Sequence, residues 1–218
     1  MREPNKIMKR KGEVTMKNLK KIAAMGMMAV MLVSSFGLTG CGGSKTEKIE
    51  GSAGLVYELS EDGTYYIFTD GKSCTDENIV IGNWHEENGK GLPVKAIGDW
   101  PFSMYDEGGS VPAKSVTVSD GITEYAEGTL GALSYVEKIV LPDGVESLGT
   151  AAFLIDFELR ELVIGKGLKR IEVDSFEKVP EDITIYFRGS EEEWNNVEIA
   201  ERGNSVLNNC KIVFDYKD

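Results

Sequence analysis

The sequence predicts a β-rich solenoid, a coil of short parallel strands joined by return segments, and three observations support this prediction. Three consecutive blocks of 23 residues, beginning at Lys114, align without a gap. Six columns of apolar residues or glycine recur at the same places in all three blocks. Each block opens with apolar residues two apart, which is the period of a β-strand. One such unit cannot bury its own apolar face, so several must stack around a shared core.

The strand columns justify the first half of each unit. Their members are 23 residues apart: Val116, Ile139, Leu162 and Ile185 in one column, and Val118, Leu141, Ile164 and Phe187 in the other. A glycine three residues later lets the chain turn: Gly121, Gly144 and Gly167. The next apolar residues follow at spacings of three and then five, as in Val145, Leu148 and Phe153. This pattern predicts an irregular or partly helical return segment.

The repeat also resembles a known family. "KIVLPDGVESLGTAAF", residues 138–153, is similar to the BspA-type leucine-rich repeat, and "NIVIG" and "LPVKAIGDWPF" match the two halves of an earlier unit. The resemblance runs from about Gly54 to Tyr216 and implies a leucine-rich-repeat solenoid over residues 79–187. "SMYDEGGSVPAKS" holds about five inserted residues, so we expect a protruding loop there.

One feature departs from the family pattern. Members of the family often carry Cys or Asn three residues after the Phe column, where the side chain bonds turn backbone along the coil. This chain has Leu133, Asp156 and Val179 at those positions. We therefore expect packing, and not a regular polar ladder, to hold the turns.

Both ends of the solenoid need a cover, because open strand edges and exposed core favour aggregation. In residues 54–78, "LVYELSEDGTYYIFTD" alternates at Leu55, Tyr57 and Leu59 before Asp62-Gly63 and at Tyr65, Ile67 and Thr69 after it, which predicts a β-hairpin over the first open edge. Residues 188–218 resemble the closing unit of the family. There Ser190 and Glu193 have the spacing of a helix capping box, Trp194 follows in the same helix-like segment, and "KIVF" forms a last strand.

Residues 1–40 predict a lipoprotein signal peptide and are set apart from the fold. Lys17, Lys20 and Lys21 precede an apolar run, and "LTGC" then resembles a lipobox. This resemblance implies cleavage by signal peptidase II between Gly40 and Cys41 and a diacylglycerol group on Cys41. A transmembrane helix is the alternative, although the apolar run is short and interrupted by glycine. Residues 41–53 are small and polar, which predicts a flexible tether.

The start of the chain is a separate question. The charged stretch "MREPNKIMKRKGEVT" precedes the basic start of the signal. Secretory signals seldom need such an extension, so our hypothesis is that Met16 is the true start and Met1 the alternative.

Charge excludes some partners. The net charge is −12, and since residues 1–40 contain eight basic and two acidic residues, the remainder carries 16 minus 34, or −18. Such acidity repels nucleic acid and anionic lipid, so we expect no nucleic-acid partner and membrane contact only through the lipid on Cys41.

Apart from Cys41, the chain has two cysteines, Cys74 and Cys210, near opposite ends of the domain. We expect two unpaired, mostly buried thiols there.

The sequence shows no catalytic cluster, metal cluster or phosphate loop, so we predict no enzyme activity, cofactor or metal. His85 is the sole histidine, and its acidic surroundings indicate an exposed loop. The carboxylates of "SEEEW", residues 190–194, stand beside an aromatic residue and could suggest sugar binding or paired-acid hydrolysis, but the capping box explains them more simply.

The strand positions between the core columns are the candidate ligand face. Thr117, Val140, Val163 and Tyr186 are 23 apart and face away from the core, so they form one row across the strands. Solenoids often bind partners there, and a covered or merely solvated row is the alternative. We predict a lipid-anchored protein on a bacterial cell surface that displays this face to a protein or glycan, as in adhesion. The alternatives are a structural envelope lipoprotein without a specific ligand, a lipoprotein hydrolase and a solute receptor.

Overall fold

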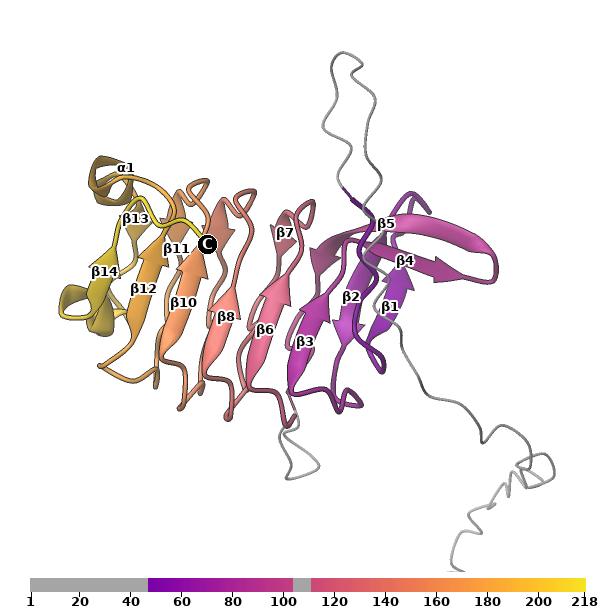
Figure 1. Cartoon of the computed structure of the whole chain (residues 1–218), viewed down its shortest axis with the longest axis horizontal. Helices are drawn as coiled ribbons and strands as arrows, with labels where there is room; N and C mark the ends of the chain where they lie inside the picture. The colour runs from indigo at the N-terminus through magenta and orange to yellow at the C-terminus, as the bar shows by residue number, and fades with distance from the viewer. Residues whose placement is uncertain (1–46, 104–110) are drawn as a thin grey trace, which may run out of the picture. The chain divides into compact units, whose positions relative to one another are not determined.

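The computed structural model describes residues 47–103 and 111–218. Every described residue lies in one compact unit, Ser44–Asp218. That unit is a solenoid with its own continuous hydrophobic core, as predicted (Figure 1). The tip of the expected loop after Phe102, residues 104–110, lies outside the described residues.

A parallel sheet of six strands forms one side of the solenoid (Figure 1). In spatial order its strands are β3 (Asn78–Ile81), β6 (Ser115–Val118), β8 (Lys138–Val140), β10 (Glu161–Ile164), β12 (Thr184–Phe187) and β14 (Lys211–Val213). The register pairs Val116 with Ile139, Ile139 with Leu162, and Leu162 with Ile185. The 23-residue columns of the sequence are therefore the ladder of the sheet.

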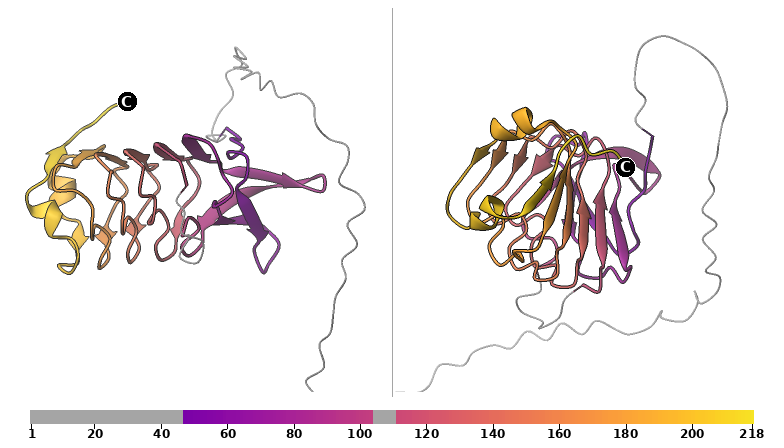
Figure 2. Two further views of the ribbon diagram at one scale, coloured as in Figure 1. Left: turned by 90° about the horizontal axis from the view of Figure 1, so that it is seen from below. Right: turned by 60° about the vertical axis from the view of Figure 1, so that its left-hand side comes forward.

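The return segments form a second, shorter layer behind this sheet, visible in the right-hand view of Figure 2. Three two-residue strands pair in parallel there: β9 (Ser147–Leu148), β11 (Arg170–Ile171) and β13 (Glu198–Ile199). β7 (Glu124–Tyr125) pairs instead with β5 (Lys90–Ile97). Only two residues of each turn pair as a strand in this layer, because the rest of the return segment bends to bury its apolar residues.

The core lies between the two layers and repeats from turn to turn. Leu148 and Ile171 point into it from the second layer, and Phe153 packs on Phe176 with ring centroids 5.2 Å apart. The bends around the Phe column use left-handed backbone at fixed places in the repeat: Gly128, Ala151 and Asp174 before it, and Ala132, Ile155 and Lys178 after it. Each set is spaced by 23 residues, so the bends have the same period as the strands.

The predicted hairpin is present, but it extends a different sheet from the one expected. β1 (Val56–Leu59) and β2 (Tyr66–Asp70) pair antiparallel, and β2 then pairs in parallel with β5 in the layer opposite β3. Tyr66 and Phe68 are the buried residues of β2. The inward face is thus one residue out of step with the alternation expected at Tyr65, Ile67 and Thr69.

The outer edge of β3 is covered by a segment that the sequence indicated as tether. The backbone N–H of Ser52 donates to the carbonyl of Val80 (2.9 Å), and that of Trp84 donates to Ile49 (3.1 Å). Asn83 is 6% exposed and its amide group donates to the carbonyl of Glu47 (3.0 Å). The expectation of a flexible tether over residues 41–53 is therefore wrong from residue 47 onward, because hydrogen bonds to Val80, Asn83 and Trp84 fix this part.

The C-terminal unit contains the expected helix start and last strand. Ser190 and Glu193 form a reciprocal capping box at the start of α1 (Glu191–Asn195), and Trp194 is buried. A short 3-10 helix, η1 (Ser205–Asn208), follows and leads into β14. The "SEEEW" carboxylates thus begin a helix, as the capping pattern predicted.

A single polar rung crosses the turns at the column of Leu133, Asp156 and Val179. Asp156 is fully buried, and its Oδ1 accepts the backbone N–H of Leu133, 23 residues earlier, at 2.9 Å. Its Oδ2 is buried without a hydrogen-bond partner, and desolvation raises the pKa of this carboxyl well above its ordinary value. The absence of a regular ladder at this column fits the prediction, but Asp156 does make the kind of bond that Asn makes in the family.

Candidate binding surface on the strand face

The predicted ligand row lies on the solvent side of the large sheet, in the expected register. Val80 pairs with Thr117, and Val140, Val163 and Tyr186 follow on successive strands. Thr117, Val140 and Tyr186 are half-buried. Val163 is only 1% exposed, so the row is not open along its whole length.

The chain end crosses the row at β12 and β10. The N–H of Tyr216 donates to the carbonyl of Phe187 (3.1 Å), and the Tyr216 ring lies 4.8 Å from that of Tyr186. Asp218 contacts Arg188 (2.7 Å) and lines a cavity together with Val140. Figure 1 shows the chain ending in front of the large sheet. The prediction that Val163 is accessible is therefore wrong, because this non-repeating tail covers the middle of the row.

What remains open is a hollow at the carboxyl ends of β3, β6 and β8, here called the strand-face groove. Its volume is about 480 Å³, and its lining residues are Ile49, Val80, Thr117, Val118, Ser119, Asp120, Val140, Leu141, Pro142, Asp143, Arg188 and Asp218. Two residues of the predicted row, Thr117 and Val140, lie in it. The groove therefore joins the repeats, the segment over β3 and the C-terminal tail.

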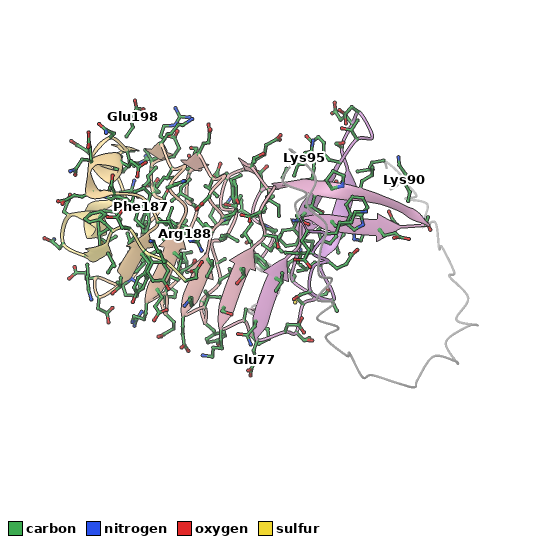
Figure 3. All side chains as sticks on the ribbon, turned by 45° about the horizontal axis from the view of Figure 1, so that its top comes forward. Glu77, Lys90, Lys95, Phe187, Arg188 and Glu198 are labelled. Atoms are coloured by element: carbon green, nitrogen blue, oxygen red, sulfur yellow. The ribbon has the colours of Figure 1, made fainter. Side chains whose placement is uncertain are left out.

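Arg188 supports the wall of the groove nearest the tail. Its guanidinium donates to the carbonyl of Leu141 (2.9 Å) and pairs with Asp218 (2.7 Å) and more distantly with Asp143 (3.8 Å). Its side chain is only 19% exposed. Figure 3 shows Arg188 over the large sheet and Glu77 at the opposite, amino end of β3. Arg188 therefore holds the tail against β8 and has little capacity left for a ligand.

A smaller recess of about 290 Å³ adjoins the groove at Asp120. Its lining includes Lys48, Trp84, Pro93 and Lys95. The Nζ atom of Lys48 lies 3.4 Å from the centroid of the Trp84 ring, which is a cation–π contact. Lys95 extends toward the ring of Tyr65, 5.6 Å from its centroid. Both ammonium groups of the recess thus already contact aromatic rings.

His85 is not in an exposed loop, contrary to the sequence interpretation. It belongs to β4 (Trp84–Glu87), which forms a hairpin with β5 through a left-handed turn at Asn88 and Gly89. Its ring stacks on Tyr57 at 4.3 Å and meets Tyr66 edge-on at 4.8 Å. An Asn-Gly pair is a strong hairpin signal, so this element could have been found from the sequence. His85 is thus part of an aromatic cluster.

Other candidate chemistry is sparse in the part of the chain that the structure describes. Cys74 is buried and free, and Cys210 is half-buried and free; burial raises the pKa of both thiols. Residues 47–103 and 111–218 contain no group of three or more His, Cys, Asp or Glu side chains able to hold a metal ion. Within the same ranges no helix is long and apolar enough to cross a membrane. Gly40 and Cys41 lie outside the described residues.

Neither a protein-family model nor a curated protein matches this sequence. Solved structures with distant likeness include a leucine-rich cell surface protein from Faecalibacterium prausnitzii (16% identity, TM-score 0.45, covering 78% of this chain and 55% of that one). A leucine-rich repeat protein from T. pallidum has 16% identity and a TM-score of 0.45, over 67% of this chain and 79% of the other. One from Bacteroides ovatus has 16% identity and a TM-score of 0.47, over 77% and 43%. The chain thus spans about half the length of the first of these proteins. The fold assignment itself rests on the strand ladders described above.

Proposed function

We propose that this protein is a repeat scaffold that displays the strand-face groove to a protein or glycan partner, as in adhesion. The observation that carries the proposal is the groove itself. It is an open hollow of about 480 Å³ on the face of the parallel sheet, lined by Thr117 and Val140 of the predicted row. Aliphatic and polar side chains meet there, as they do in binding sites.

The proposed location is the outer face of a bacterial cell membrane, with a lipid on Cys41 as anchor. The support is the "LTGC" motif after an apolar run and a basic start. The resemblance of the repeats to the BspA-type family supports display at the surface. A net charge of −18 after residue 40 supports a soluble domain that the membrane surface does not attract.

Binding of the unit from Ser44 to Asp218 to extracellular-matrix proteins and glycans tests the function. The informative variant is Val140→Asp, since Val140 is half-exposed in the groove. Val163→Asp is unsuitable, because a carboxylate there would be buried and would destabilise the fold. Val56→Asp is the matched control, since Val56 is 49% exposed on β1, away from the groove lining.

A saturable partner that Val140→Asp loses and Val56→Asp keeps would support the proposal. Equal loss in both variants, or a partner indifferent to Val140, would contradict the assignment of the groove. No saturable binding to any member of the panel would favour the structural envelope alternative.

Membrane partitioning of the full chain tests the anchor. Wild-type protein should fractionate with membranes, and Cys41→Ala should move to the soluble fraction. Cys74→Ala is the control, because that thiol is buried in the core and distant in sequence from the lipobox. Membrane association that survives Cys41→Ala would overturn the lipid anchor.

A further inference from the structure

We propose that the strand-face groove binds an extended segment of a partner protein through a lysine or arginine side chain. This inference rests on the proposed function and specifies the chemistry of the partner. It depends on a free carboxylate, an unpartnered hydroxyl and an apolar floor, all of which line the same groove.

The carboxylate is that of Asp120. Three aspartates and one arginine line the groove: Asp120, Asp143, Asp218 and Arg188. Arg188 is shared between Asp143 and Asp218, whereas the Asp120 side chain has no ion pair or hydrogen bond in the described part of the chain. Asp120 is also exposed and lines both the groove and the adjoining recess. The lining of the groove therefore carries a net charge of −2, and the Asp120 carboxylate is free to pair with a ligand.

The hydroxyl is that of Ser119, the residue next to Asp120. Ser119 is only 6% exposed, and among the described residues its Oγ makes no hydrogen bond. Ser119 lines the groove, so this oxygen is free to accept a hydrogen bond from a ligand there. An ammonium or guanidinium group has several N–H donors. A single such group can therefore satisfy both Ser119 Oγ and the Asp120 carboxylate.

The apolar floor favours a peptide over a free polyamine. Val80, Thr117 and Val140 lie side by side on three neighbouring strands, β3, β6 and β8. Strands are about 4.8 Å apart, so the floor is roughly 10 Å wide, and an extended segment advances about 3.3 Å per residue. About three residues fit across it. An apolar side chain beside the cation would cover the valines, which a polyamine leaves in water.

Charge opposes an acidic glycan as the occupant. The chain after residue 40 has 34 acidic and 16 basic residues, so an anion is repelled on approach. The two lysines of the adjoining recess already contact the Trp84 and Tyr65 rings. The Lys48 contact also places an ammonium group of the chain itself in the recess that Asp120 lines. Neither lysine is therefore free to pair with an acidic group of a ligand.

Fluorescence anisotropy with a labelled six-residue Lys-Val alternating peptide tests the inference on the unit from Ser44 to Asp218. A Glu-Val peptide, spermine and a hyaluronate oligosaccharide are the competing probes. The variants are Asp120→Asn and Ser119→Ala. Asp76→Asn is the matched control, since Asp76 is also exposed, makes no side-chain ion pair or hydrogen bond among the described residues, and precedes β3 at the opposite end of the sheet.

The expected result is saturable Lys-Val binding that Asp120→Asn weakens about tenfold and Ser119→Ala about threefold, as for loss of a charged and a neutral hydrogen bond. Asp76→Asn should change the affinity less than twofold. Thermal melts of all variants should match the wild type, because the Asp120 side chain and Ser119 Oγ have no described partners.

Three results would overturn the inference. Equal weakening by Asp76→Asn would mean diffuse charge attraction, and spermine binding as tight as the peptide would mean a polyamine site. Binding of hyaluronate in place of the Lys-Val peptide would mean an acidic glycan, and this would leave the proposed function standing. Failure of the proposed function itself would give a different result. No peptide, glycan or matrix protein would then lose binding in the Val140→Asp variant.

Discussion

The middle turns and the N-terminal end of this solenoid are built by different means. Between Lys114 and Phe187 each strand pairs with the next in one 23-residue register, and the same columns fill the core. Between Glu47 and Phe102 the chain forms two antiparallel hairpins and a segment tied to β3 by hydrogen bonds. Stability in the middle should therefore depend on repeated packing, and at the end on individual polar contacts. The strand-face groove lies where the two regions meet.

The largest effect is expected from Phe153→Ala in the middle turns. Phe153 is fully buried and packs on Phe176, so the truncation leaves a cavity and should lower the free energy of unfolding by about 3–5 kcal/mol. Chemical denaturation measures the loss. Phe157→Ala is the control in the same turn, since Phe157 is 50% exposed and should cost less than about 0.5 kcal/mol. Similar losses in both variants would contradict the packing account.

Asn83→Ala should destabilise the N-terminal end of the solenoid and leave the middle turns unaffected. The Asn83 amide accepts the N–H of Ile49 (2.9 Å) and donates to the carbonyls of Glu47 and Asp120 (3.0 and 2.8 Å). Losing these bonds should cost about 2–3 kcal/mol, mainly where the segment over β3 is held.

Hydrogen exchange would show whether that loss is local. Amides of residues 47–52 should lose protection in Asn83→Ala while those of β8 and β10 keep theirs. Asn196→Ala is the control, because among the described residues its exposed side-chain amide makes a single hydrogen bond, to the carbonyl of Glu192. Unchanged protection over residues 47–52 would mean that Asn83 does not hold the segment.

Asp156→Asn tests the one buried carboxyl of the middle turns. Burial raises the pKa of Asp156 in the folded state, so the folded protein retains the proton more tightly than the unfolded chain does. This stabilisation is fully present below the ordinary pKa of about 3.9 and is lost as pH rises toward the folded value. Asn carries no charge, so the variant should be more stable than wild type near pH 7, by about 1–2 kcal/mol, and similar to it near pH 4.

A pH series of thermal melts would measure that difference. Asp182→Asn serves as control, since the Asp182 side chain is 72% exposed and its replacement should leave the pH profile nearly unchanged. If Asp156→Asn and wild type kept a constant gap from pH 4 to pH 8, the buried carboxyl would not be the source of the pH dependence.

The smallest effect is expected from Lys178→Gly. Lys178 is exposed and has a φ of 70°, a conformation that glycine adopts at little cost. The substitution should raise the free energy of unfolding by roughly 0.5 kcal/mol, net of the entropy that glycine adds to the unfolded chain. Lys166→Gly should lower it instead, because Lys166 is outside the left-handed region. Denaturant midpoints would distinguish the two signs, and destabilisation by both would contradict the assigned backbone.

The middle turns were predictable because their core residues recur at a fixed spacing in the sequence. Val116, Ile139 and Leu162 are 23 apart in sequence and adjacent in the sheet, so the spacing alone predicts the strand register. The β1–β2 hairpin followed from Asp62-Gly63, and α1 followed from Ser190 and Glu193. These are local signals, and each places a short element.

The end contacts and part of the site were not predictable, because they depend on long-range contacts that occur once. Nothing periodic indicates that Tyr216 packs on Tyr186 or that Asp218 pairs with Arg188, so the burial of Val163 could not be foreseen. The segment over β3 is small and polar, and its composition alone suggested a tether. The predicted row supplied Thr117 and Val140 of the groove, while Ser119 and Asp120 emerged only from the cavity they line.

The most direct test of the central claim is to map where a partner binds on the unit from Ser44 to Asp218, by amide chemical shifts during titration with the Lys-Val peptide. Binding in the strand-face groove predicts saturable shifts gathered at Val80, Ser119, Asp120 and Val140, with β1, α1 and the tip of the β4–β5 hairpin unchanged. Saturable shifts centred on α1 or on the hairpin tip, with the groove residues unmoved, would contradict it.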